Sequence, residues 1–208
     1  MYDQTSSIES FLAAAAARQP APGGGSATAL VAALSAAMGE MAINYSIGKK
    51  SLAEFEDELR PARVEFERAR RMMIQLMVED QLAYEALTAA RKLPDAAPER
   101  PAKFEAALLA CIRVPQAMAA TGVAILELCD HVVNFINFHL LSDLAVSADL
   151  AMASVRCATY NVRANLPDVA DPDDRKRIEE TTMHVMIRAA KLIQQVSPRI
   201  WARHAQGA

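Results

Sequence analysis

The sequence predicts an all-α fold, an antiparallel bundle of about six helices that forms a single domain over residues 1–208. Hydrophobic residues make up 52% of the chain but aromatic residues only 5%, a mixture rich in Ala, Leu, Val, Ile and Met that packs helices closely. Apolar residues recur at helical spacing, and no segment alternates apolar and polar residues long enough to be a strand. The length suits one domain with a sizeable core, and no shift in composition indicates a second.

The first two helices are predicted on either side of a segment rich in proline and glycine, "QPAPGGGS" at residues 19–26. Ile8, Phe11, Leu12 and Ala15 have the i, i+3, i+4, i+7 spacing of a short amphipathic helix that this segment ends. Ser26 is expected to cap the next helix, which extends to about Ser46. Because its residues are mostly small, we expect this helix to lie centrally in the bundle.

The third helix is long and contains a proline. Ser51 and Glu54 have the spacing of a capping box at its start, and helical periodicity continues toward Arg91. Pro61 predicts a kink or a restart, because its ring removes one backbone donor. The loop "KLPDAAPERP" follows.

A fourth helix is expected over residues 103–137, with a kink or break near Cys111 caused by Pro115. Ser142 is expected to cap a fifth helix that ends near Asn165. The sixth helix should begin with Asp171 as N-cap and Pro172 at the first helical position. An apolar stripe along it is interpreted as core: Ile178, Thr182, Val185, Ala189, Leu192, Val196 and Ile200.

Charge and composition argue against several classes of function. A net charge of −3 provides no basic surface for nucleic acid. Cys111, Cys129 and Cys157 are widely spaced, so we interpret them as buried thiols in a reducing cytoplasm. The N-terminus lacks the pattern of a secretory signal, and the apolar run 27–43 is short for a bilayer and contains Glu40. We therefore expect a cytoplasmic protein that binds neither membrane nor nucleic acid.

Two common kinds of catalytic centre lack their motifs. The histidines have neither an HExxH pattern nor an i, i+4 spacing with one another, so no metal site is predicted. They are His131, His139, His184 and His204. No GxSxG motif surrounds a serine, which argues against a hydrolase nucleophile of that type.

Four features have both a structural and a functional interpretation from spacing alone. The loop Gly23, Gly24, Gly25, Ser26 is either a tight turn or a place where the backbone approaches a carboxylate or a ring; it lacks the Lys-Ser/Thr ending of a nucleotide-binding P-loop. Ser142 and Asp143 are either a helix cap or, if burial raises the carboxyl pKa, part of an acid/base site.

Asp80 and Tyr84 lie one turn apart on an otherwise apolar helix face, where they either hydrogen-bond inside the bundle or point at a ligand. Asn161 and Asn165 share another helix face. Their amides suit a heterocycle with several donors and acceptors, or simply cap the helix end.

Taken in order, these pieces resemble the formiminotransferase-cyclodeaminase C-terminal domain and the stand-alone methenyltetrahydrofolate cyclohydrolases. The resemblance covers about residues 8–195 and rests on five segments after the glycine-rich opening. These segments are "SIGKK", "EDQLAYEAL", "RVPQAMA", "SDLAVSADLA" and "YNVRANL". It implies an all-helical homodimer that binds tetrahydrofolate and needs no metal or other cofactor.

Formiminotetrahydrofolate cyclodeaminase is the leading activity that the resemblance implies. In that reaction N10 of the folate attacks a formimino carbon on N5, and ammonia leaves. Methenyltetrahydrofolate cyclohydrolase, in which water opens the methenyl bridge, is the alternative. Each reaction needs a group that takes a proton and returns it to a departing nitrogen. A non-catalytic helical binding protein that kept the fold is a further alternative.

The resemblance also assigns residues. Asp143 is the first choice for the acid/base and Asp80 the second, while the Gly23–Ser26 loop approaches the folate. Lys49 and Lys50 would meet the anionic glutamate tail. Asn161 and Asn165 would frame the pterin.

One stretch before Ser142 departs from the family pattern Gly-Asn-x-Asn. Here the chain reads "INFHLLSD", so Asn137 matches the first asparagine, whereas Ile136 replaces glycine and His139 replaces the second asparagine. His139 is therefore a candidate substitute proton carrier.

Overall fold

The computed structural model describes residues 2–3 and 5–206, and this part of the chain forms six α-helices and three short 3-10 helices, which confirms the all-α prediction. The α-helices are α1 (Ile8–Ala16), α2 (Gly24–Asn44), α3 (Glu56–Arg91), α4 (Arg100–Val132), α5 (Leu141–Asn165) and α6 (Pro172–Gln206). The 3-10 helices are η1 (Lys50–Phe55), η2 (Phe138–Leu140) and η3 (Leu166–Asp168).

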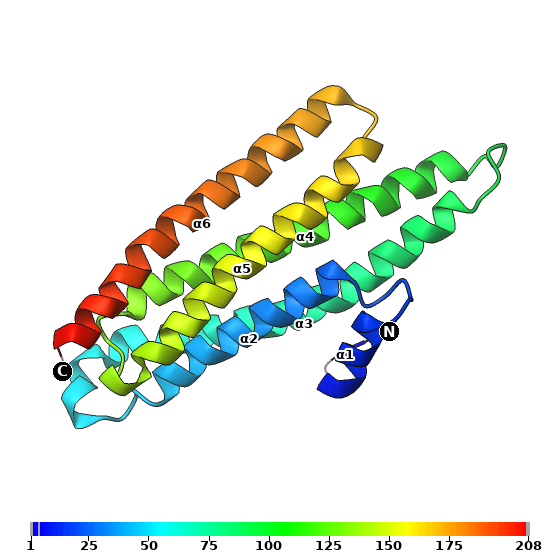
Figure 1. The fold of residues 1–208 in the computed structure, drawn as a ribbon. Helices are drawn as coiled ribbons and strands as arrows, with labels where there is room; N and C mark the ends of the chain where they lie inside the picture. Colours follow the sequence, from blue (N-terminus) through cyan, green and yellow to red (C-terminus); the bar gives the residue numbers. More distant parts are fainter. Residues whose placement is uncertain (1, 4, 207–208) are drawn as a thin grey trace.

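Four long helices form the centre of the bundle. Helix α2 packs against α3 and α5, and α4 packs against the same two helices, so the four enclose one core. Helix α6 covers α5 and α4, while α1 lies to one side (Figure 1). Successive long helices run in opposite directions because short connections join them, as an antiparallel bundle requires.

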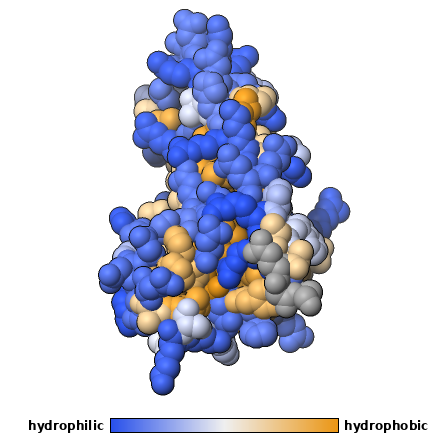
Figure 2. All heavy atoms as spheres, turned by 90° about the vertical axis from the view of Figure 1, so that its left-hand side faces the viewer, coloured by the Kyte–Doolittle hydropathy of each residue, from blue (hydrophilic) through white to orange (hydrophobic). Residues whose placement is uncertain are grey.

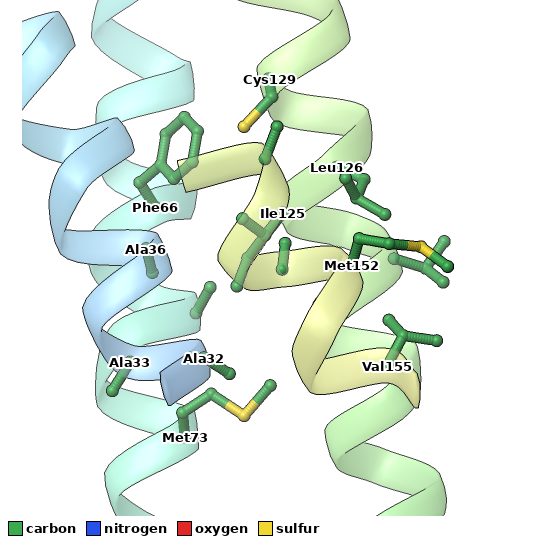
Figure 3. Close-up of a cluster of buried hydrophobic side chains, with 14 of the residues drawn as sticks. Ala32, Ala33, Ala36, Phe66, Met73, Ile125, Leu126, Cys129, Met152 and Val155 are labelled. Carbon is green, nitrogen blue, oxygen red and sulfur yellow. The ribbon is translucent and has the colours of Figure 1, made fainter. Parts of the chain in front are cut away.

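Small residues let α2 lie close to its neighbours, as predicted. Ala32, Ala33 and Ala36 of α2 point into the core (Figure 3), and each is at most 5% exposed. A Cβ at Gly39 would lie 2.2 Å from the ring of Phe66 on α3, so glycine is what allows this ring to pack on the α2 backbone. Helix α2 is therefore the central helix that its sequence predicts.

Three predicted helix starts are wrong. Helix α2 begins at Gly24 with Gly23 as N-cap, and Ser26 is already inside the first turn. The expected capping box of Ser51 and Glu54 lies within η1, so α3 begins only at Glu56. In the third case Ser142 follows the first residue of α5, whose N-cap is Leu140. For α3 and α5 the reason is the 3-10 turn that leads directly into the helix.

Neither internal proline breaks its helix. Helix α3 continues through Pro61 and α4 through Pro115, so a restart at Pro61 and a break near Cys111 are wrong, while a kink at either proline stays a prediction. Pro115 has no backbone donor for the Cys111 carbonyl, which lies one turn earlier. The side-chain Nδ2 of Asn165 on α5 donates to this carbonyl instead, at 3.3 Å. A neighbouring helix thus satisfies the group that the proline leaves free.

The start of α6 is as predicted. Oδ1 of Asp171 accepts hydrogen bonds from the backbone N–H groups of Asp173 and Asp174, so Asp171 is the N-cap. The interpretation of its apolar stripe as core is also confirmed, because these positions are buried or partly buried against the bundle.

Some apolar positions are more exposed than the sequence suggests. In α1 the buried residues are Phe11 and Ala14, whereas Ile8 and Leu12 are 74% and 58% exposed. Of the three thiols expected to be buried, only that of Cys129 is; Cys111 is partly exposed and Cys157 is exposed. The helical spacing identifies an apolar face but not the neighbour that covers it.

By length and composition alone, three stretches are long and apolar enough to cross a membrane. They are Gly24–Asn44, Arg100–Val132 and Phe138–Asp168, and 56%, 56% and 44% of their most apolar windows are buried inside the bundle. Glu40, within the first stretch, forms an ion pair with Arg70 of α3 at 2.9 Å.

Candidate active site

The predicted site residues fall into two groups at opposite ends of the bundle. We call one the glycine end; it contains Gly23, Gly24, Gly25, Ser26, Asp80, Asn161 and Asn165. The other is the lysine end, with Lys49, Lys50, Asn137, His139, Ser142 and Asp143. Because an α-helix rises 1.5 Å per residue, α2 separates the two ends by roughly 30 Å. One protomer therefore does not bring all the predicted residues together.

At the glycine end, the carboxyl group of Asp80 on α3 packs directly on the first turn of α2. The Ser26 hydroxyl donates to Asp80 Oδ2 at 3.1 Å, and Ser26 is fully buried. A Cβ on Gly25 would lie 2.0 Å from Asp80 Oδ1, so only glycine leaves space for the carboxyl group. The first turn of a helix has unpaired N–H groups, which favour a carboxylate there.

The environment of Asp80 changes its acidity. Burial raises the pKa of the Asp80 carboxyl above its ordinary value, while hydrogen bonds from the hydroxyl and backbone of Ser26 partly oppose this rise. The carboxyl group therefore holds a proton at higher pH than a surface aspartate does. A carboxyl group whose pKa is raised can act as a general acid and, once ionised, as a general base.

Cys111 on α4 lies near the same carboxyl group. Burial, and then the negative charge of Asp80, raise the pKa of the Cys111 thiol to about 11, although Arg91 opposes the shift. The thiol therefore remains protonated at neutral pH and is a poor nucleophile.

A small hollow lies between the start of α2 and the second half of α5. Its volume is about 350 Å³. It is lined by Gly24, Ala27, Thr28, Val31, Ser154, Cys157, Tyr160 and Asn161. Asn161 Nδ2 donates to Thr28 Oγ1 at 3.4 Å, and that hydroxyl donates to the Gly24 carbonyl at 2.7 Å. Asn161 thus faces the glycine loop and this hollow.

The two asparagines of "YNVRANL" have different surroundings. Asn165 Nδ2 donates to the backbone carbonyls of Asn161 and Cys111, at 2.9 and 3.3 Å. Its amide nitrogen is therefore used inside the protein. Tyr84 is 43% exposed, and Asp80 bonds to Ser26 rather than to it. Sequence reasoning did not include Thr28, although its position one turn after Gly24 was a usable signal.

The lysine end is exposed and built from connections between helices; Figure 2 looks onto it and shows a mostly hydrophilic surface with hydrophobic residues between. Lys49 and Lys50 are exposed next to Gly48, whose φ of 80° suits glycine. The Gly48 N–H donates to Glu56 Oε1 at 2.9 Å. A hollow of about 360 Å³ lies at the α2–α3 junction, lined by Asn44, Ile47, Arg60, Arg63 and Val64. Two lysines and two arginines thus lie at this end, together with acidic residues such as Glu56, which pairs with Arg60.

Asn137 shapes the loop between α4 and α5. Its backbone N–H donates to the Ser46 hydroxyl at 2.8 Å, and its Oδ1 accepts from the His139 backbone N–H at 3.3 Å. The exposed His139 ring lies edge-on to Phe138, with ring centres 5.6 Å apart. Arg203 of α6 donates to the carbonyls of Val133 and Ile136 and so supports the same loop.

Asp143 and Ser142 lie in the first turn of α5 at this end. Ser142 is exposed and Asp143 is partly exposed. Within residues 2–3 and 5–206, neither side chain forms a hydrogen bond or an ion pair. In the same part of the chain, no three His, Cys, Asp or Glu side chains converge on a possible metal position.

The chain is similar to proteins of known family. Residues 7–184 match the family model described as formiminotransferase-cyclodeaminase. A methenyltetrahydrofolate cyclohydrolase from Methylorubrum extorquens is 34% identical over 177 residues, which cover 83% of this chain and 84% of that protein. A formimidoyltransferase-cyclodeaminase from Rattus norvegicus is 29% identical over 201 residues. That match covers 93% of this chain but only 37% of the rat protein.

The fold is also similar to a solved structure. The crystal structure of formiminotetrahydrofolate cyclodeaminase from Thermotoga maritima superposes with a TM-score of 0.88 at 26% sequence identity. The match covers 95% of this chain and 97% of that one.

Proposed function

The chain belongs to the formiminotransferase-cyclodeaminase family, and we propose that it is an enzyme acting on the one-carbon unit between N5 and N10 of tetrahydrofolate. The observation that carries this proposal is the partly buried Asp80 carboxyl group, packed against Gly25 and bonded to Ser26. Its raised pKa suits a group that exchanges protons with a substrate. The chemistry requires no cofactor beyond the folate.

The leading reaction is formiminotetrahydrofolate cyclodeamination. N10 attacks the formimino carbon and gives up its proton to a carboxylate. The resulting tetrahedral carbon is bonded to N5, N10 and the departing nitrogen. The carboxylic acid then returns the proton to that nitrogen, which leaves as ammonia with the electron pair of the broken C–N bond. The Thermotoga cyclodeaminase supports this reaction by matching nearly the whole chain.

Methenyltetrahydrofolate cyclohydrolysis is the second candidate. Here water attacks the methenyl carbon, and the carboxylate takes a proton from the water. The carbon–N5 bond then breaks with its electron pair on N5, which receives that proton. The second proton of the water is released to solvent as the carbon–oxygen bond becomes the C=O of the formyl group on N10. The higher identity to the Methylorubrum cyclohydrolase, 34% against 26% for the solved cyclodeaminase, favours this reaction.

Asp80 is our first choice for the acid/base, ahead of Asp143. Both carboxylates belong to partly exposed residues, but Asp80 packs on the glycine loop, accepts the Ser26 hydroxyl and has a pKa raised by burial. Among the described residues, Asp143 has no hydrogen-bond or ion-pair partner. Burial raises the pKa of the Asp80 carboxyl group, which favours the protonated form that a general acid needs. The pterin then lies near the hollow lined by Asn161, and Asn161 offers it an amide.

We further propose that two copies of the chain form a homodimer through α2 and α5. These neighbouring helices carry large apolar side chains exposed to solvent. Leu34 on α2 and Tyr45 at its C-cap are 51% and 61% exposed, and Val146 and Tyr160 on α5 are 47% and 63% exposed. A two-fold axis across the middle of α2 would pack the exposed apolar side chains of α2 and α5 against the same side chains of a second copy. It would also bring the glycine end of one protomer to the lysine end of its partner.

The proposed function is tested with purified protein and two substrates. The absorbance of the methenyl species should rise with 5-formiminotetrahydrofolate, or fall with 5,10-methenyltetrahydrofolate, faster than without enzyme. Acceleration of one reaction alone distinguishes the two activities. If the protein accelerates neither reaction, and Asp80→Asn binds folate as well as wild type does, the chain is instead a non-catalytic protein that kept the fold.

The composite site is tested by mixing two inactive or impaired variants. Asp80→Asn changes the glycine end, and the Lys49→Ala, Lys50→Ala double variant changes the lysine end. If each site uses two chains, refolding the variants together produces mixed dimers with one unaltered site, and activity returns. If activity does not rise above that of the separate variants, each protomer works alone.

A further inference from the structure

We propose that Ser26 is a positioning residue, which determines the oxygen of the Asp80 carboxyl group that carries the catalytic proton. The inference rests on the proposed function, because it assigns a role within the same site. Its basis is the hydrogen bond from the Ser26 hydroxyl to Asp80 Oδ2, at 3.1 Å. The hydroxyl has a single hydrogen, and this contact uses it.

The two oxygens of Asp80 differ in their surroundings. Oδ2 accepts the Ser26 hydrogen bond, so a proton on the same oxygen would compete with that contact. Oδ1 is the oxygen nearest to Gly25, at 2.0 Å from the position that a Cβ would take. Among the described residues, no other side chain donates to the carboxyl group. Oδ1 fills the space that the missing Cβ of Gly25 leaves, and the Ser26 backbone also donates to the carboxyl group. The catalytic proton is therefore assigned to Oδ1, because Oδ2 is the oxygen that accepts the Ser26 hydroxyl.

Ser26 is well fixed for this role. It is fully buried, so solvent does not replace its hydroxyl. It lies in the first turn of α2, while Gly23 is the N-cap, so the hydroxyl is free from capping its own helix. Ser26 therefore bonds across to α3 and joins the glycine loop to the acid/base.

The same oxygen then serves both proton transfers. As a carboxylate, Asp80 Oδ1 forms a new O–H bond while the N–H or O–H bond of the nucleophile breaks. That O–H bond breaks later, when the departing nitrogen takes the proton together with the electron pair of its C–N bond. Ser26 keeps its own proton, and the carboxyl group does not need to rotate between the steps.

The groups near Asp80 do not add a titration of their own to the pH profile that is assigned to it. Cys111 on α4 has a pKa of about 11 and is neutral throughout the working range. Ser26 on α2 has no titratable group, and Arg91 on α3 is the cation that acts on the Cys111 thiol. If substitution of Ser26 shifts one limb of the pH–activity profile, that limb is therefore assigned to Asp80.

The first experiment compares Ser26→Ala with wild type in the active assay. We expect kcat to fall roughly 10- to 100-fold with a small change in KM, because the carboxyl group is no longer oriented. The limb of the pH profile due to Asp80 moves to higher pH, because the lost hydrogen bond favours the ionised form. Ser26→Thr keeps a hydroxyl and should keep the limb in place.

Ser35→Ala is the matched control. Ser35 is also a buried serine of α2, but its hydroxyl donates to the Ser147 carbonyl at 2.7 Å, away from the site. This variant should lose stability and leave the pH limb unchanged. If Ser26→Ala does not fold, Ser26→Cys replaces it, because a thiol is a weak donor and the same shift is expected.

A second experiment does not depend on turnover. The Asp80 carboxyl group is titrated in the free protein by carbon-13 NMR, with its signal assigned by Asp80→Asn. A titration that moves to higher pH in Ser26→Ala supports the inference, even if wild type converts neither folate, which would overturn only the proposed function. An unchanged titration together with unchanged kcat overturns the role of Ser26, while wild-type turnover would leave the proposed function intact.

Discussion

The two ends of α2 differ in how their candidate functional side chains are held and in how far these side chains are exposed to solvent. At the glycine end, backbone and buried side chains hold Asp80 where burial raises its pKa. At the lysine end, exposed cations lie on connections between helices, and the neighbouring Glu56 has a lowered pKa because Arg60 and then the Gly48 N–H donate to it. The comparison teaches that proton transfer needs a dry, fixed environment, whereas attraction of an anion needs only accessible charge.

The largest expected difference between the ends is catalytic. Asp80→Asn should lower kcat by roughly 10²- to 10⁴-fold, the contribution of a general acid/base, because an amide does not exchange the proton. Asp143→Asn, at the exposed start of α5, should lower it less than about tenfold. Steady-state kinetics on both folates check this. A larger loss of kcat in Asp143→Asn than in Asp80→Asn would instead identify Asp143 as the acid/base.

The next effect concerns packing at the glycine end. Gly25→Ala should lower the free energy of unfolding by roughly 1–3 kcal/mol and abolish turnover, because the new methyl group occupies the place of the Asp80 carboxyl group. Urea unfolding and the folate assay measure the two effects.

Gly39→Ala is the matched control for that clash. Its Cβ would lie 2.2 Å from the Phe66 ring, in the core and away from both ends. A similar loss of stability with turnover kept per folded molecule is expected. If both variants lose turnover equally, the effect of Gly25→Ala comes from general unfolding rather than from Asp80.

A smaller effect is expected at the lysine end. The Lys49→Ala, Lys50→Ala double variant should weaken binding of polyglutamylated folate about fivefold at low salt, and less at high salt, because exposed charges are screened. Binding of the monoglutamate should change less. Lys103→Ala, an exposed lysine of α4 remote from this loop, serves as the control in the same titration. Equal weakening for both folates would contradict the assignment of the tail.

The smallest effect is the opposite pH dependence of stability at the two ends. The folded pKa of Asp80 is raised above 3.8, so its contribution is present below that value and is lost as pH rises through the folded pKa. The folded pKa of Glu56 is lowered below 4.5, so its contribution is present above 4.5 and is lost as pH falls through the folded pKa.

Asp80→Asn should therefore gain stability relative to wild type on going from acid to neutral pH, whereas Glu56→Gln should lose it. Free energies of unfolding across this range measure both. Parallel curves for the two variants would contradict the contrast between the ends.

Much of the fold was predictable because helix formation depends on local pattern. Periodicity identified the six helices, and Asp171 with Pro172 marked the start of α6 correctly. Helix starts were less predictable, because η1 and η2 precede α3 and α5 as 3-10 turns. The break expected at Pro115 was wrong for a related reason. Asn165, 50 residues after Pro115, satisfies the carbonyl that the proline leaves free, and no local pattern contains that contact.

The sequence alone determined the all-helical class, the central position of α2 with its many small residues, and the family, because spacing and motif order are properties of the chain. Only the tertiary structure decided how the candidate residues are grouped. It placed Asp80 against Gly25 and Ser26, and it separated them from Asp143 by the length of the bundle. The physical reason is that burial and orientation, which set the pKa of a carboxyl group, come from neighbours distant in sequence.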